Sequence, residues 1–273
     1  MQVLAPQSHE TNTDLDLQCL ISGGADAKIM VWDTATGDRL HTLRDKTDSM
    51  MAVQDLALDP QDSTDSEVVL VSSSSDPHIR RWRISLSSAS QVVDPADVSP
   101  SKPTRQTILE HETSVYQVLF WGEDDSLDLW TASADGTAKC LSRERNWSAE
   151  ETYEHGDYVR AVAVTADWVV TAGRDEDVKV WDRATGKLRH VYEGHYEEVT
   201  GLVLLPGMKI ISTGIDRTIR TWGLSRSQIE QAIKEKEETA KGAAKEDSVE
   251  PKKSLLTEEE EAELAELMGS DSE

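Results

Sequence analysis

The chain has 273 residues, 37% of them hydrophobic, which is enough for one large β domain or two smaller domains with a packed core. Its 52 acidic and 28 basic residues give a net charge of −24, which should repel nucleic-acid phosphates and anionic lipid headgroups, so we expect no direct nucleic-acid partner. No stretch approaches ~18 uninterrupted apolar residues, and the first residues lack a signal peptide's basic start and apolar run, so we expect neither a membrane span nor a secreted protein.

The two cysteines, Cys19 and Cys140, are far apart and have neither zinc-ligand spacing nor a disulfide framework. We interpret them as small buried side chains of a protein in a reducing compartment, the cytoplasm or the nucleus. Calcium-loop, nucleotide-loop and paired-cysteine motifs are also missing from the sequence. We therefore expect no metal site and no cofactor.

In chain order, one short pattern recurs five times. An aspartate is followed six residues later by a tryptophan in four copies, and a small hydroxyl residue precedes each aspartate by four residues. Between the hydroxyl residue and the tryptophan, alternating apolar and β-branched residues predict two short strands joined by a tight turn. In chain order the copies are Ser22/Asp26/Trp32, Ser72/Asp76/Trp82, Thr131/Asp135/Leu141, Thr171/Asp175/Trp181 and Ser212/Asp216/Trp222.

The last two copies, between residues 153 and 224, also share a histidine before the first of these strands. His155 and His195 are 40 residues apart, which is the length of one four-stranded propeller blade. These recurring landmarks resemble those of the WD40-repeat β-propeller family, and the resemblance covers residues 1–224. It implies an all-β fold in which the histidine, hydroxyl, aspartate and tryptophan of a blade form one hydrogen-bonded set.

The resemblance implies two complete sets and three incomplete ones. The third blade keeps His111 but has Leu141 in place of the tryptophan, and the second has Ser49 in place of the histidine. We therefore expect blades two and three to be held less rigidly than blades four and five. The complete sets are His155, Thr171, Asp175 and Trp181, and then His195, Ser212, Asp216 and Trp222.

The expected propeller domain, residues 1–224, has about five recognisable blades near 1–43, 50–86, 106–152, 153–193 and 194–224. A Ser- and Pro-rich stretch predicts a disordered loop at 87–104. The first copy lacks an innermost strand, and no outer strand follows Trp222. Two interpretations remain open: an incomplete seven-bladed ring that lacks N-terminal blades, or a compact five-bladed ring whose last blade is three-stranded or is closed by residues 1–4.

The residues from 225 to 273 predict a charged, acidic and partly helical tail. Glu/Lys pairs are typical of a solvated helix, with expected breaks at Gly242 and Pro251. Beyond the second break, a short helix that starts at Thr257 would place three apolar residues on one face, and a helix this short is marginal alone and is expected to fold on a partner. A tail that only solvates the domain is equally consistent with this composition. The candidate contact residues are Leu264, Leu267 and Met268.

The trio His155, Thr171 and Asp175 has the residue types of a hydroxyl nucleophile, its base and an orienting carboxylate. The same trio recurs at His195, Ser212 and Asp216, whereas a catalytic trio needs a single copy. We therefore interpret the trios as structural and predict that the protein is not an enzyme.

What remains is a binding surface on the propeller rim that carries the histidine and aspartate turns. Tyrosine and arginine are the types that most often dominate interface energies. The candidate rim residues are Tyr116, Tyr158, Arg160, Arg174, Glu198, Thr200 and Ile215.

We predict a protein-interaction scaffold or adaptor that is monomeric outside its complex. The alternative is a substrate receptor of a cullin-RING ubiquitin ligase or another ubiquitin-pathway adaptor. Family members with that role carry an arginine two residues after a Trp-Asp pair, whereas here it follows directly, as in Trp181-Asp182-Arg183. The motif fails in every blade, which disfavours the alternative.

Overall fold

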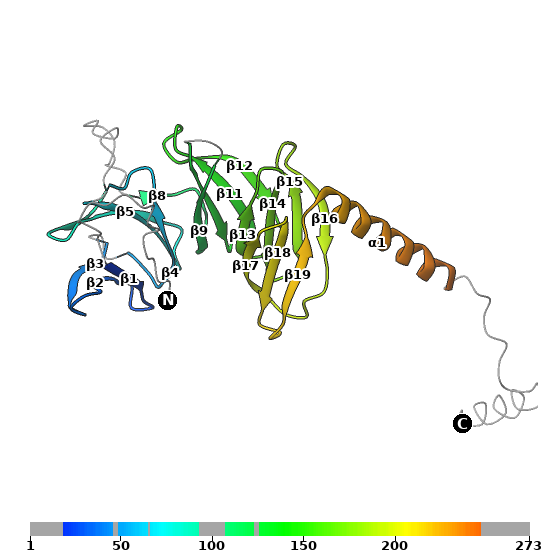
Figure 1. Cartoon of the computed structure of the whole chain (residues 1–273), viewed down its shortest axis with the longest axis horizontal. Coiled ribbons are helices and arrows are strands. Elements are labelled where there is room, and N and C mark those ends of the chain that lie inside the picture. Colours follow the sequence, from blue (N-terminus) through cyan, green and yellow to red (C-terminus); the bar gives the residue numbers. More distant parts are fainter. Residues whose placement is uncertain (1–18, 46–48, 65, 93–106, 123–125, 247–273) are drawn as a thin grey trace, which may run out of the picture. The chain divides into compact units, whose positions relative to one another are not determined.

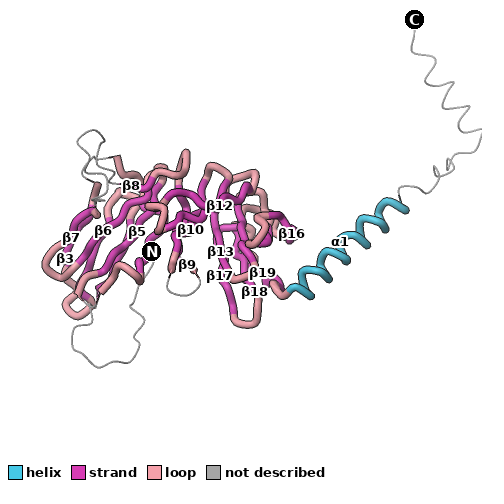
Figure 2. The backbone as a smooth tube through the Cα atoms, turned by 90° about the horizontal axis from the view of Figure 1, so that it is seen from above, coloured by secondary structure: helices cyan, strands magenta, loops and turns pink. Residues whose placement is uncertain are grey.

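The computed structural model describes residues 19–45, 49–64, 66–92, 107–122 and 126–246. The chain divides into two units, Met1–Leu224 and Ser225–Glu273. The described part of the first unit consists of β-strands, and that of the second is one helix (Figures 1 and 2).

The first unit is built from five antiparallel sheets that follow one another along the chain. This confirms the expected all-β propeller class. The first sheet has β1 (Cys19–Gly23), β2 (Ile29–Asp33) and β3 (Arg39–Leu43), and the second has β4 (Val53–Asp59), β5 (Val68–Ser74), β6 (Ile79–Ile84), β7 (Ala89–Gln91) and β8 (Thr107–Ile108). The third has β9 (Val115–Trp121), β10 (Asp128–Ser133), β11 (Thr137–Ser142) and β12 (Ser148–Glu154). The fourth has β13 (Val159–Val164), β14 (Trp168–Gly173), β15 (Val178–Asp182) and β16 (Lys187–Tyr192), and the fifth has β17 (Val199–Leu205), β18 (Lys209–Gly214) and β19 (Ile219–Gly223).

The recurring aspartate marks the tight turn between two paired strands in every sheet. In four of the five turns, the residue directly after the aspartate has a positive φ, as at Glu176 with φ 70° and Gly136 with φ 86°. The strands then pair so that Thr171 is opposite Lys179 and Val169 is opposite Trp181. Because side chains alternate between the two faces, the hydroxyl residue and the tryptophan lie on the same face as diagonal neighbours.

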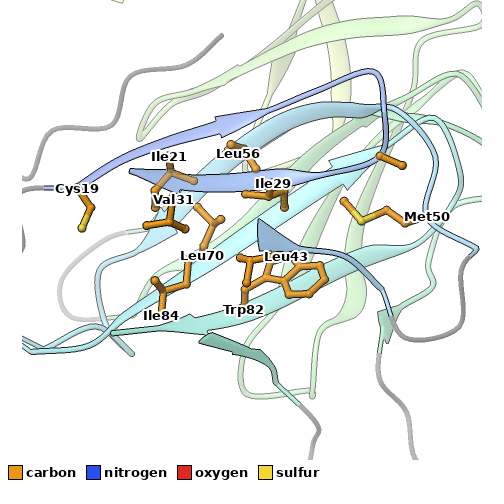
Figure 3. Packing of buried hydrophobic residues seen from close by; sticks show 11 residues of the cluster. Cys19, Ile21, Ile29, Val31, Leu43, Met50, Leu56, Leu70, Trp82 and Ile84 are labelled. Carbon is orange, nitrogen blue, oxygen red and sulfur yellow. The ribbon is translucent and has the colours of Figure 1, made fainter. Parts of the chain in front are cut away.

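The hydrophobic core lies between consecutive sheets. Figure 3 shows Ile21, Ile29 and Val31 of the first sheet packed against Leu70 and Trp82 of the second. A second cluster joins the second and third sheets, and a third cluster joins the third and fourth. Each sheet is thus buried by its neighbour in sequence. Both cysteines are buried, and burial raises the pKa of each thiol.

The second sheet has an outer edge that the sequence analysis did not predict. Two short strands, β7 and β8, pair with different ends of β6. The expected disordered loop 87–104 was therefore wrong at its start, because residues 89–91 form a strand at this edge. The expected third blade began too early, because residues 107–108 belong to the second sheet. Residues 93–106 lie outside the described part of the chain.

Helix α1 (Arg226–Glu246) forms the described part of the second unit. Ser225 begins it with a capping box, in which its Oγ accepts from the N–H of Gln228 and the Gln228 side chain accepts from the N–H of Ser225. The break expected at Gly242 was wrong, because the alanine and lysine residues around it favour helix strongly enough to carry one glycine. No helix within the described residues is long and apolar enough to cross a membrane.

Candidate functional site

The two complete polar sets are brought together as the family pattern implies. In the fourth sheet, ring nitrogens of His155 lie 2.8 Å from Thr171 Oγ1 and 2.8 Å from an oxygen of Asp175. The indole N–H of Trp181 also donates to Thr171 Oγ1, at 2.8 Å. The fifth sheet repeats this geometry: His195 lies 2.7 Å from Ser212 and 2.9 Å from Asp216, and Trp222 donates to Ser212 at 2.8 Å.

The carboxylates of these sets are held in their charged form. Burial alone would raise the pKa of Asp175, but hydrogen bonds from His155 and Lys179 outweigh it and lower that pKa to about 2. The same balance lowers the pKa of Asp135 and of Asp216. The sets are fixed networks beneath the surface, and the Thr171 and Ser212 hydroxyls are fully buried. A hydroxyl in that position is not placed to attack a substrate from solvent.

The third sheet keeps His111 between Thr131 and Asp135, with both distances 2.7 Å. Leu141 replaces the tryptophan and is fully buried. The Thr131 hydroxyl donates to the carbonyl of Lys139 at 3.3 Å. The hydrogen-bonded set of side chains therefore has three members here, whereas it has four in each of the next two sheets.

The second sheet replaces the histidine with a residue that the sequence analysis overlooked. Arg80 is fully buried, and its guanidinium donates to Asp45 at 2.8 Å and to Asp76 at 3.0 Å. Ser49, which stands in the histidine position, is 3.4 Å from the same guanidinium. The sequence predicts that this blade is held less rigidly than the fourth and fifth, and it gave no sign of the ion-pair network that takes the place of the histidine.

Above these sets, one rim carries the ends of the inner strands β9, β13 and β17. Val159 pairs with Gly173 at this edge, so the start of an inner strand and the turn after the following strand lie together. The Arg160 guanidinium lies 4.1 Å from the centre of the Tyr116 ring, and its Nε donates to Glu198. These three side chains come from three consecutive sheets, so the contact runs along the rim.

Two further tyrosine–arginine pairs lie on the same rim. The guanidinium of Arg174 lies 5.1 Å from the Tyr158 ring centre, and that of Arg220 lies 5.5 Å from the Tyr196 ring centre. Tyr158 is 41% exposed and Tyr196 is 76% exposed, so each ring offers a free face to solvent. Ile215 is exposed beside them, its N–H bonded to the carbonyl of Glu198.

Tyr196 and Arg220 were missed by the sequence analysis. Tyr196 directly follows the histidine of its blade, and a tyrosine at such a turn is itself a signal for an interface residue. Of the predicted rim residues, Thr200 is exposed but is engaged with the carbonyl of Thr213 at 3.2 Å. The predicted tail residues Leu264, Leu267 and Met268 lie outside the described residues.

The described residues support neither a metal site nor a ligase-receptor motif. Within the described residues, no group of three or more histidine, cysteine or carboxylate side chains is arranged to hold a metal ion. Arg183, the residue nearest to a ligase-receptor motif, has its guanidinium 4.4 Å from the Trp121 ring centre.

Comparisons with known proteins agree with this architecture. The family model described as "WD domain, G-beta repeat" matches residues 148–182 and 186–223. An uncharacterized WD repeat-containing protein of Schizosaccharomyces pombe is 33% identical over 250 residues, which cover 91% of this chain and 60% of that protein. Nuclear distribution protein nudF of Aspergillus niger is 28% identical over 226 residues, covering 76% of this chain and 47% of that protein. The chain thus spans about half the length of these relatives.

A solved structure, the WD40 beta propeller domain of Doa1, is similar in fold. Its TM-score is 0.56 at 20% sequence identity, and the match covers 77% of this chain and 62% of that one. At this identity the similarity concerns the fold alone.

Proposed function

Because the chain belongs to the WD40-repeat family, we propose that it is a non-catalytic scaffold that binds a partner protein on its rim. The residues that define this rim are Tyr116, Tyr158, Arg160, Arg174, Tyr196, Glu198, Ile215 and Arg220. WD40-repeat proteins generally act as protein-interaction scaffolds. The observation that carries the proposal for this chain is the row of tyrosine–arginine pairs across three consecutive sheets.

The physical basis is that these side chains are already arranged for binding. A tyrosine ring stacked on a guanidinium has lost much of its rotational freedom before a partner arrives, which lowers the entropic cost of association. Tyr158 and Tyr196 remain exposed to solvent. Large aromatic surfaces with a polar tip are the usual anchors of protein interfaces.

The absence of catalysis in this proposal rests on burial and repetition. The only hydroxyl–histidine–aspartate trios found in the described residues are enclosed, and they recur in consecutive sheets as parts of the fold. We also propose a cytoplasmic or nuclear location, from the two buried free cysteines. The ubiquitin-ligase role stays a prediction.

Affinity capture with the full chain as bait tests the rim. We expect the double variant Tyr158→Ser/Tyr196→Ser to lose at least ~10-fold in recovery of the partners that the unchanged chain retains, because two exposed anchors are removed. The matched control is Leu86→Ser/Leu188→Ser, which removes two exposed apolar side chains elsewhere. If the rim variant retains every partner that the control retains, the binding surface lies elsewhere.

A further inference from the structure

One position of the repeat, directly opposite the recurring hydroxyl residue, holds a cation in the last four sheets. In the second, third and fourth sheets the fold itself engages this cation. Arg80 is bound by two carboxylates. Lys139 and Lys179 each donate to a backbone carbonyl at the histidine turn of their own blade, at 2.5 Å and 2.7 Å. These three cations therefore stabilise the blades in which they lie.

Arg220, which holds this position in the fifth sheet, is engaged differently. The aspartate of its blade, Asp216, is already bonded by the blade's histidine and by the hydroxyl of Thr218. Within the described residues Arg220 forms no ion pair: its Nε donates to Thr218 Oγ1, and its guanidinium lies over the Tyr196 ring. A Cβ at Gly194 would lie 3.1 Å from Nη1 of Arg220, so the glycine leaves room for the guanidinium. The charge of Arg220 is thus available on the rim.

Two more arginines offer their charge on the same rim. Arg174 and Arg217 are exposed in the turns that follow β14 and β18. Neither forms an ion pair with another residue of the described ranges, and the Arg174 guanidinium lies over the Tyr158 ring. A stacked guanidinium uses its flat face and keeps the N–H donors at its edge for an acceptor. Arg160 differs from these arginines, because its Nε donates to Glu198.

We propose that the partner bound on the rim presents an acidic segment, whose carboxylates pair with Arg174, Arg217 and Arg220. The inference rests on the proposed function, because it names the chemistry that the same rim recognises. Arginine binds a carboxylate through two parallel N–H···O bonds, which fix orientation as well as charge. The exposed rings of Tyr158 and Tyr196 adjoin two of these arginines and offer apolar surface to the aliphatic stems of glutamate side chains.

The placement of the charges favours carboxylates over a phosphate group. Arg174 and Arg220 lie over the rings of two different blades, so the positive charges are spaced along the rim. A phosphate group concentrates its charge and its acceptor oxygens at one point, where it is bound best by donors that converge on it. Carboxylates that follow one another along a peptide match a row of single cations.

Carboxylates of the same turns limit how an acidic segment can bind. Glu176 and Glu197 are exposed in turns of the fourth and fifth sheets, and neither forms an ion pair within the described part of the chain. Because like charges repel, the segment must place its carboxylates on the arginines and away from these two glutamates. The net charge of −24 also disfavours nonspecific binding of acidic peptides. Binding of such a peptide therefore reports the local site.

Peptide selection on the full chain tests the proposal. A library of random peptides is selected on the immobilised chain, and enriched peptides are synthesised with a fluorescent label for anisotropy titration. We expect these peptides to be rich in Asp and Glu, and Arg174→Gln/Arg220→Gln to weaken their binding at least ~10-fold, because two charge-assisted pairs are lost. The matched control, Lys187→Gln/Arg189→Gln, removes two exposed cations from β16 and should bind as the unchanged chain does. Urea unfolding checks that both variants are folded.

Changes to the peptide identify the group that is recognised. One enriched peptide is compared with a form in which Asn and Gln replace its acidic residues, and with that amide form carrying one phosphoserine. We expect the acidic form to bind at least ~10-fold more tightly than the amide form, and more tightly than the phosphoserine form. Selection of neutral or basic peptides, equal binding of the amide form, or tightest binding of the phosphoserine form would overturn the proposal.

The tyrosine variant separates this inference from the proposed function. If Tyr158→Ser/Tyr196→Ser loses captured partners while Arg174→Gln/Arg220→Gln retains them, the rim binds proteins without using its arginines, and only the inference fails. If both double variants retain every partner that the unchanged chain captures, the rim is not the binding surface, and both proposals fail. Loss of the same partners by both variants, with the Lys187→Gln/Arg189→Gln control unaffected, is the result we expect.

Discussion

At the scale of single residues, Arg80 shows how one side chain can replace a histidine-centred network. Its guanidinium is fully enclosed and is neutralised by Asp45 and Asp76. Burial alone would raise the pKa of Asp76, but hydrogen bonds from Arg80, His78 and Ser74 and the Arg80 charge outweigh it, so this pKa is lowered. Two carboxylates around one arginine leave the cluster dependent on that arginine.

Removing the arginine should therefore be costly. We expect Arg80→Met to reduce the free energy of unfolding by ~3–5 kcal/mol, because Asp45 and Asp76 would remain buried without their partner. Urea unfolding followed by tryptophan fluorescence measures this difference. The matched control is Arg83→Met in the same strand, whose ion pair with Glu67 is 3.8 Å long and exposed. It should cost less than ~1 kcal/mol, and equal losses for the two variants would refute the role of Arg80.

The polar sets divide into those that the sequence predicts and one that it does not. His155, Thr171 and Asp175 could be assigned because a second copy at His195 fixes the spacing. Arg80 could not, since it stands where Lys139 and Lys179 stand in other blades and suggests an ordinary surface cation. Arg80 is the centre of a buried cluster because the fold brings Asp45, which is distant in sequence, within hydrogen-bond distance of its guanidinium.

At the scale of elements, neighbouring inner strands are joined by side chains that accept from the next strand's backbone. Asp55 of β4 accepts from the N–H of Val118 in β9 at 3.0 Å, and Gln117 of β9 accepts from the N–H of Val162 in β13 at 2.7 Å. The same connection is thus made once by a carboxylate and once by an amide. The amide makes it without burying a charge.

Burial raises the pKa of Asp55 to about 6, although hydrogen bonds from the N–H groups of Val118 and Leu56 oppose the shift. The folded protein therefore holds this proton more tightly than the unfolded chain, whose carboxyl has a pKa near 3.8. The contribution to stability is greatest below pH ~4 and is lost as the pH rises through ~6.

The variant Asp55→Asn should remove this loss. Near pH 7 we expect it to be more stable than the unchanged chain by up to ~3 kcal/mol, with the advantage shrinking toward pH 4, because the amide still accepts from Val118 without carrying a charge. Urea unfolding at several pH values from ~4 to ~7 checks this. A variant that is less stable than the parent at pH 7 would show that the charge itself holds β4 and β9 together.

Elements that follow the repeat were predictable, and those that interrupt it were not. The two strands on either side of the aspartate turn in each sheet follow from the spacing of hydroxyl, aspartate and tryptophan, as in Thr171 to Trp181. The outer edge of the second sheet is made by residues 89–91 and 107–108, whose pairing with β6 is set by tertiary contact and not by local pattern.

At the scale of the whole molecule, five sheets in series bury one another and place one row of side chains along a rim. The rim contact from Tyr116 through Arg160 to Glu198 exists only because three sheets are stacked. The sequence predicted most of this surface, since the positions follow from the repeat. It missed Tyr196 because the corresponding positions, Glu112 and Gly156, are not aromatic.

Site-specific photo-crosslinking tests directly the proposal that partner proteins bind on the rim. A photoreactive phenylalanine analogue placed at position 196 should yield crosslinks to bound partners, whereas the same residue at exposed position 188 in β16 should not. Partners crosslinked at position 188 and not at position 196 would contradict the claim.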